Sequence, residues 1–97
     1  MTFRIERTSA GRKTRLRLSG ELREADLESL KAEIARDGQR VALDLEELSL
    51  VDVEGIRFLN ACEAEGIEVL LGAPYIREWM SQERADRKDR TQRNPEN

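Results

Sequence analysis

The change of hydrophobic period on either side of Asp52 is the feature that most constrains the fold. Residues 41–45 are apolar except for Asp44 and continue as an apolar strand towards Asp52. Directly after it, Ile56, Leu59 and Cys62 recur at the spacing of one helical face. A strand has a side-chain period of two and a helix one of 3.6. A carboxylate at the junction accepts from the exposed amides of the helix start, so capping alone accounts for Asp52. The pattern predicts a strand followed at once by a helix.

The same reading places elements along the rest of the chain. We expect strands at residues 3–7 and 14–19, a helix at 24–36 that stops at Gly38, a strand at 67–71, and a last helix from Pro74. The order is β-β-α-β-α-β-α, and the fold class is α/β. Charged residues interrupt the strands on one side, which favours a two-layer structure with a four-stranded mixed sheet, helices on one face and the other face solvated. The interrupting residues are Arg15, Arg17, Asp44 and Glu68.

Length and composition indicate one small domain. The chain has 97 residues, of which 38% are charged, and a formal net charge of -3. This balance gives no electrostatic reason to expect nucleic-acid binding. No apolar run is long enough for membrane insertion, and a single cysteine forms no internal disulfide, so we expect a cytoplasmic protein. Residues 1–82 are predicted to form the domain, and the polar tail 83–97 to be disordered or a frayed continuation of the last helix.

Catalytic chemistry has little support in the sequence. The chain contains no histidine, which removes the commonest general base and the commonest metal ligand. It also lacks a Cys-x-x-Cys pair, a P-loop and a dinucleotide fingerprint. Cys62 falls on the apolar face of its helix, which is typical of a core residue. We therefore expect no catalytic residue, no cofactor and no metal, and interpret the chain as a non-enzyme.

Three short motifs carry a resemblance to a known family. Gly20-Glu21-Leu22 follows an apolar strand, Asp52 and Gly55 mark the strand-to-helix turn, and Gly72-Ala73-Pro74 leads into the last helix. Together they resemble the anti-sigma-factor antagonist family of STAS domains, over about residues 3–82. The family pattern at the turn is Asp-Ser-Ser-Gly, with the first serine phosphorylated, whereas Val53 and Glu54 occupy the serine positions here. The family also has a further strand and helix after the third helix, and we expect no such strand here because residues 83–97 show no strand pattern.

The resemblance implies a STAS-like βα superhelix and a function. It implies a non-catalytic signalling adaptor, a divergent anti-sigma-factor antagonist that is not regulated by serine phosphorylation. The partner would be an anti-sigma factor or a related regulator. The docking surface it implies comprises Arg23, Asp52, Val53, Glu54, Gly55 and Arg57. Two other functions stay open: a STAS subunit of a membrane transport complex, and a small-ligand-binding domain.

Three finer points also stay open. Gly55 falls in the first helical turn, where glycine is unfavourable, so either tight packing or a partner contact explains it. Glu54 either adds charge at the helix start or imitates a phosphoserine. Strand 67–71 would lie at the edge of the sheet, and an uncovered edge would allow a homodimer.

Overall fold

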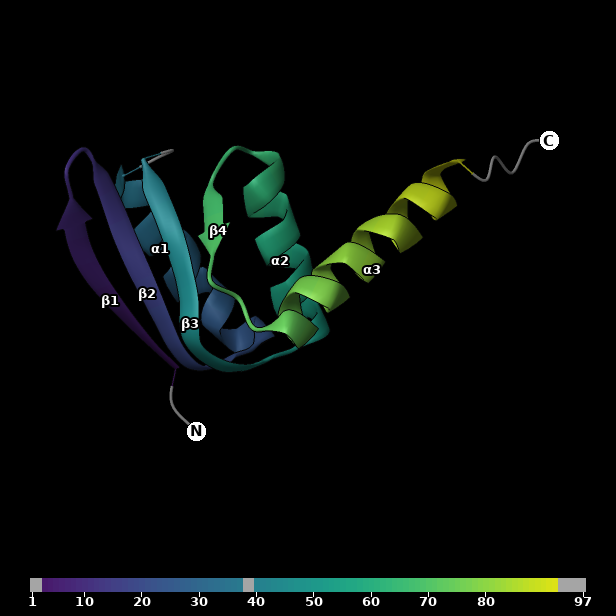
Figure 1. The fold of residues 1–97 in the computed structure, drawn as a ribbon, viewed down its shortest axis with the longest axis horizontal. Coiled ribbons are helices and arrows are strands. Elements are labelled where there is room, and N and C mark those ends of the chain that lie inside the picture. The colour runs from purple at the N-terminus through teal and green to yellow at the C-terminus, as the bar shows by residue number, and fades with distance from the viewer. Residues whose placement is uncertain (1–2, 38–39, 93–97) are drawn as a thin grey trace.

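The fold combines one mixed sheet with three helices (Figure 1). A computed structural model describes residues 3–37 and 40–92. The elements are β1 (Phe3–Ala10), β2 (Lys13–Leu22), a short 3₁₀ turn η1 (Glu24–Asp26), α1 (Leu27–Asp37), β3 (Val41–Val51), α2 (Val53–Ala64), β4 (Glu68–Leu70) and α3 (Pro74–Gln92). The strands lie in the order β1-β2-β3-β4; β1 and β2 are antiparallel, and the other two pairs are parallel. The predicted element order and mixed sheet are therefore confirmed.

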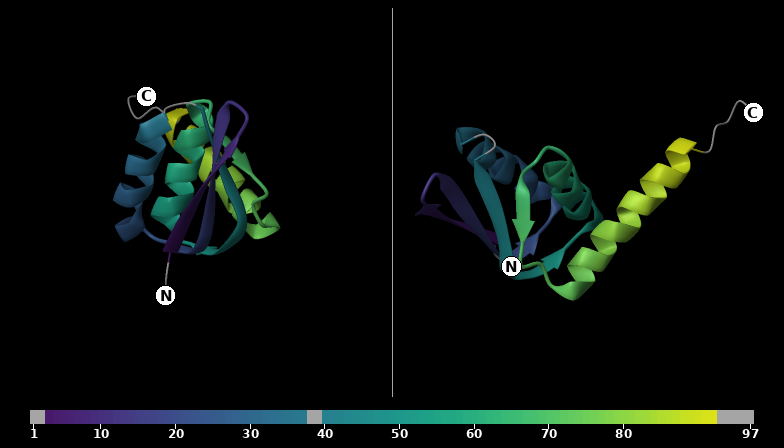
Figure 2. Two further views of the ribbon diagram at one scale, coloured as in Figure 1. Left: turned by 90° about the vertical axis from the view of Figure 1, so that its left-hand side faces the viewer. Right: turned by 45° about the horizontal axis from the view of Figure 1, so that its top comes forward.

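The core lies between the sheet and the helices. Leu16 and Leu18 of β2 and Leu43 and Leu45 of β3 are fully buried, as their alternation predicts. Ile56, Leu59 and Cys62 of α2 are buried in the same cluster. Figure 2 shows α1 and α2 side by side on one face of the sheet. The period-two and period-3.6 patterns therefore meet in one hydrophobic layer, and the expectation that Cys62 is a core residue is confirmed.

The opposite sheet face departs from the solvated surface that the sequence predicts. Arg15, Arg17 and Glu68 are at least partly exposed, but Asp44 is only 1% exposed. The register places Arg17 directly beside Asp44 and Arg15 beside Ala42. Long arginine side chains cover the shorter carboxylate, which the alternation pattern alone does not reveal. The expectation of a solvated Asp44 is therefore wrong.

Helix α3 packs on α2 and then extends away from the body of the molecule (Figure 1). Ile76 and Met80 are fully buried, and the Asn60 side chain donates from Nδ2 to the Met80 carbonyl oxygen at 2.9 Å. The helix continues to Gln92, so residues 83–92 are a continuation of α3. Residues 93–97 of the expected tail, and the helix stop expected at Gly38, lie outside the described residues. Within residues 3–37 and 40–92, no strand follows β4.

Candidate functional site

The candidate site forms where two neighbouring parallel strands end. β2 runs to Leu22, beyond its predicted range of residues 14–19, and β3 runs to Val51, as expected for the strand into Asp52. The two strand ends are joined because the Asp52 backbone N–H donates to the Leu22 carbonyl oxygen at 3.1 Å. In sheets of this kind, binding sites gather outside the carboxyl ends of the strands. The join brings Arg23, which follows β2, beside Asp52, which follows β3.

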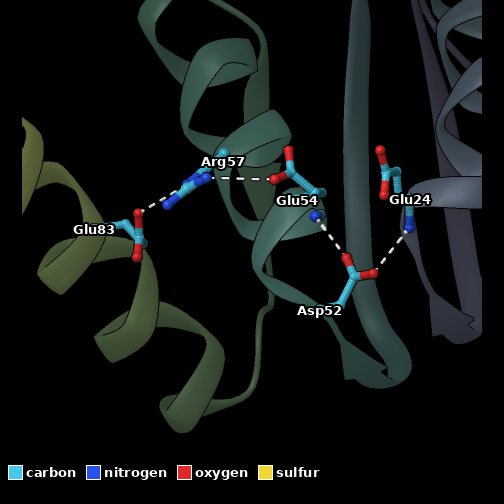
Figure 3. Close-up of polar contacts among 6 residues, drawn as sticks. Glu24, Asp52, Glu54, Arg57 and Glu83 are labelled. Carbon is cyan, nitrogen blue, oxygen red and sulfur yellow. Dashed lines mark hydrogen bonds and ion pairs between the residues drawn. The ribbon is translucent and has the colours of Figure 1, made fainter.

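The Asp52 carboxylate fixes two helical starts at once (Figure 3). Its Oδ1 accepts from the Gly55 backbone N–H at 2.9 Å, and so caps α2. Its Oδ2 accepts from the Glu24 backbone N–H, also at 2.9 Å, at the start of η1. The predicted capping role is confirmed for α2. The bond to Glu24 spans 28 residues, and nothing in the local sequence points to it.

Gly55 is buried against the two strand ends. A Cβ atom at this position would lie 2.6 Å from Val51 Cγ2 and 3.3 Å from Leu22 Cγ. The 2.6 Å distance is shorter than real Cβ contacts and would require Val51 to move, and the 3.3 Å distance is tighter than most such contacts. Of the two explanations for this glycine, the tight packing of the helix start on the strands therefore accounts for it.

Glu54 and Arg57 form the exposed edge of the first turn of α2. Arg57 Nη1 donates to Glu54 Oε2 at 3.3 Å, and Arg57 Nε donates to Glu83 Oε1 of α3 at 3.1 Å (Figure 3). The hydrogen bond and the charge of Glu83, with a smaller contribution from Glu54, raise the pKa of Arg57. The Arg57 guanidinium therefore links the start of α2 to α3 and stays charged at every accessible pH. The ion pair between Arg57 and Glu83 was not predictable from the sequence, because residue 83 was expected to lie in the polar tail.

A hollow lies where β2 and β3 end. Its volume is about 250 Å³, and its lining combines apolar and charged side chains: Leu22, Arg23, Leu50, Val51 and Asp52. Leu50 is 50% exposed. Two other large apolar side chains, Leu71 and Tyr75, are also exposed where β4 ends and α3 begins. The Tyr75 hydroxyl donates to the Ser49 carbonyl oxygen, so the start of α3 contacts the end of β3.

The structure thus brings together Arg23, Asp52, Glu54 and Arg57 of the predicted surface, with Val53 half-buried and Gly55 beneath them. Sequence reasoning missed Leu50. Its signal was an apolar residue two places before the helix cap, where Leu48 and Val51 already supply the buried positions. Leu50 lines the hollow and is half exposed, so its side chain is accessible to a partner at this point.

Other features of the structure offer little for chemistry. Among the described residues, no group of three or more histidine, cysteine, aspartate or glutamate side chains could hold a metal ion. Burial, and secondarily the charges of Glu65 and Glu63, raise the pKa of Cys62 to about 12, which leaves the thiol protonated. No described helix is both long enough and apolar enough to cross a membrane. A hollow of about 520 Å³ beside α3 is lined by residues of that helix alone.

Comparison with known proteins identifies the fold. Neither protein-family models nor curated proteins give a match to the sequence. The solved structure of the anti-sigma factor antagonist SpoIIAA in its unphosphorylated form matches with a TM-score of 0.60 and 21% sequence identity, over 92% of this chain and 98% of that chain. The native form of Mglu matches with a TM-score of only 0.41 and 25% identity, over 72% of this chain and 23% of that chain. From the first match and the observed topology, the chain has the STAS-like fold found in an anti-sigma factor antagonist.

Proposed function

We propose that this protein is a non-catalytic signalling adaptor that binds another protein through the surface at the start of α2. The carrying observation is an exposed apolar residue, Leu50, beside a hollow that is bordered by fixed charges. We define this docking surface as Arg23, Leu50, Asp52, Val53, Glu54 and Arg57. The fold likeness to an anti-sigma factor antagonist supports an anti-sigma factor or a related regulator as the partner.

The exposure and charge of each residue indicate what it contributes to the docking surface. A hollow of about 250 Å³ is smaller than typical small-molecule pockets of roughly 300–1,000 Å³, and suits one apolar side chain of a partner. Arg23, Glu54 and Arg57 lie at the exposed edge, where charges govern recognition and association rate more than affinity. Asp52 uses both oxygens to hold the backbone, so it shapes the docking surface instead of providing a free charge.

Glu54→Lys tests the docking surface, and the chain offers a closely matched control. Glu54 lies in the first turn of α2 and pairs with Arg57 three residues later. Glu28 lies in the first turn of α1 and pairs with Lys31 three residues later. Glu54→Lys and Glu28→Lys therefore make the same charge change at the same helical position, and only Glu54 lies in the docking surface; the Glu28 side chain is the more exposed of the two.

Immobilised wild type and both variants would be exposed to native lysate, and the recovered proteins identified by mass spectrometry. We expect a protein that wild type and Glu28→Lys both retain and Glu54→Lys loses, and whose binding is then reproduced with purified components. Circular dichroism would confirm that each variant is folded. Equal recovery on all three baits would place the docking site elsewhere.

We also propose that the docking surface is not switched by phosphorylation. Val53 and Glu54 carry no hydroxyl, and the nearest one, Ser49 Oγ, donates to the Gly20 carbonyl oxygen at 2.9 Å. Incubation with a serine kinase of the anti-sigma type, followed by peptide mapping, should show no phosphate between Asp44 and Ile56. Phosphate on Ser49 would contradict this proposal.

A further inference from the structure

A second charged site lies on the sheet face opposite α1 and α2, apart from the docking surface. Arg15 and Arg17 of β2 converge on Asp44 of β3: Arg15 Nε lies 3.1 Å from Asp44 Oδ2, and Arg17 Nε lies 3.8 Å from the same oxygen. Asp44 Oδ1 accepts from the Glu46 backbone N–H at 2.9 Å. One carboxylate thus anchors two guanidinium groups that come from the same strand.

The burial of Asp44 is costly for stability. Asp44 Oδ2 and Arg15 Nε are both buried, and neither has a hydrogen-bond partner of good geometry. Removing a carboxylate from water costs several kcal/mol in real proteins, and an ion pair offsets this only with excellent geometry and further hydrogen bonds. An apolar residue in place of Asp44 would fill the same space without the free-energy cost of removing a charge from water. The two oxygens of Asp44 therefore have separate roles: Oδ1 satisfies the Glu46 amide beside the register shift between β2 and β3, and Oδ2 positions the two arginines.

The arginines remain available to solvent above their anchor. The side chain of Arg15 is 40% exposed and that of Arg17 is 45% exposed. Each contacts Asp44 through Nε, and among the described residues neither Nη group of either arginine makes a hydrogen bond. A guanidinium with free Nη atoms is suited to bidentate binding of a carboxylate or phosphate. Anchoring reduces the side-chain entropy that such binding would cost.

The surrounding charges favour a small acidic group over an extended polyanion. Lys13 of β2 reaches across β3 and pairs with Glu68 of β4 at 2.7 Å. The charge of Lys13 is therefore already neutralised. Glu6 lies opposite Arg17 in the register and pairs with Arg4 at 3.7 Å. Two arginines share Asp44 between these flanking carboxylates, and Glu46 and Glu47 are exposed directly after Asp44 on β3. The two guanidinium groups are therefore the cationic centre of a mixed-charge face, on a chain of net charge -3.

We infer that the Arg15–Arg17 pair binds an acidic side chain in a short segment of another protein, with Asp44 as the positioning residue. An aspartate or glutamate of the partner would accept from the free Nη groups. A nucleic-acid backbone would meet Glu6 and Glu68 on either side of the pair, and the net charge of the chain opposes it. The occupant is therefore an acidic peptide segment, and the proposal does not depend on the docking surface at α2.

A labelled hexaglutamate peptide tests the site by fluorescence anisotropy at an ionic strength of about 0.1 M, where the Debye length is about 10 Å. Arg15→Gln with Arg17→Gln should weaken binding by about tenfold or more, since two charge-assisted contacts are lost. Lys31→Gln with Arg36→Gln is the matched control, because it removes two cations from α1 on the other face. This control should leave the affinity within about twofold of wild type, as expected for charges screened by distance.

Two further measurements keep the test decisive. The double glutamine variant leaves Asp44 buried without a cation, which destabilises the fold. The double variant Arg15→Lys, Arg17→Lys avoids this because it retains both charges, and it should still weaken binding because lysine lacks the planar fork of arginine. In wild type, the peptide should shift the Nε resonances of Arg15 and Arg17 in nitrogen-15 spectra. An absence of peptide binding to wild type, equal weakening by the α1 control, or tighter binding of a hexathymidylate strand at the same arginines would each overturn the inference.

Discussion

Removal of the Asp52 carboxylate should loosen two segments that are far apart in the sequence. The loss of an N-cap costs roughly 0.5–2 kcal/mol, typically about 1. The second bond, to the Glu24 amide, adds about 1 kcal/mol for a charged acceptor that is partly screened by solvent. We therefore expect Asp52→Ala to lower the free energy of unfolding by about 2 kcal/mol, a substantial part of the roughly 5–15 kcal/mol of a typical domain.

Asp52→Asn separates the two bonds. The amide group of asparagine has one acceptor oxygen, so it satisfies either Gly55 or Glu24 but not both. We expect about half the cost of the alanine variant. Urea unfolding followed by Trp79 fluorescence would measure both variants, with an unchanged denaturant slope as the check on two-state behaviour.

Amide hydrogen exchange gives the refuting result directly. In Asp52→Ala, the amides of Gly55 and Glu24 should both exchange faster than in wild type, whereas the β1–β2 amides should accelerate only as far as the lower global stability requires. Faster exchange at Gly55 alone, or a stability loss below about 0.5 kcal/mol, would mean that the bond to Glu24 contributes nothing and that Asp52 is only a local cap.

Three other predictions follow from the packing. Gly55→Ala should cost about 1 kcal/mol, because overpacking of roughly 1–3 kcal/mol exceeds the helix-propensity gain of up to about 1, and Val51→Ala should relieve that cost in a double-mutant cycle. Native Cys62 should resist iodoacetamide at pH 8, and rapid labelling of the native protein would contradict this. Stability should fall between pH 9 and 12, since the thiol ionises near its ordinary pKa of 9.0 in the unfolded chain, whereas burial raises the pKa in the folded protein to about 12. The edge at Glu68–Leu70 should allow weak homodimers, and sedimentation showing only monomer at high concentration would exclude them.

The sequence determined the elements and their order. Each element has its own hydrophobic period, and these periods are local properties that a single pass along the chain can read. The strand into Asp52 and the helix after it were therefore predictable, as was the burial of Cys62 on the α2 face. The capping role of Asp52 was predictable for the same reason, since a cap acts within three residues.

Only the tertiary structure decided which distant groups meet. Alternation placed Asp44 on the open sheet face, but its burial depends on the parallel register that sets Arg17 beside it. Gly55 could not be explained until Leu22 and Val51 were seen to close on the helix start. The second bond of Asp52 and the contact of Arg57 with Glu83 likewise join segments more than 25 residues apart. These contacts depend on how strands and helices stack, which is a non-local property that no sequence window contains.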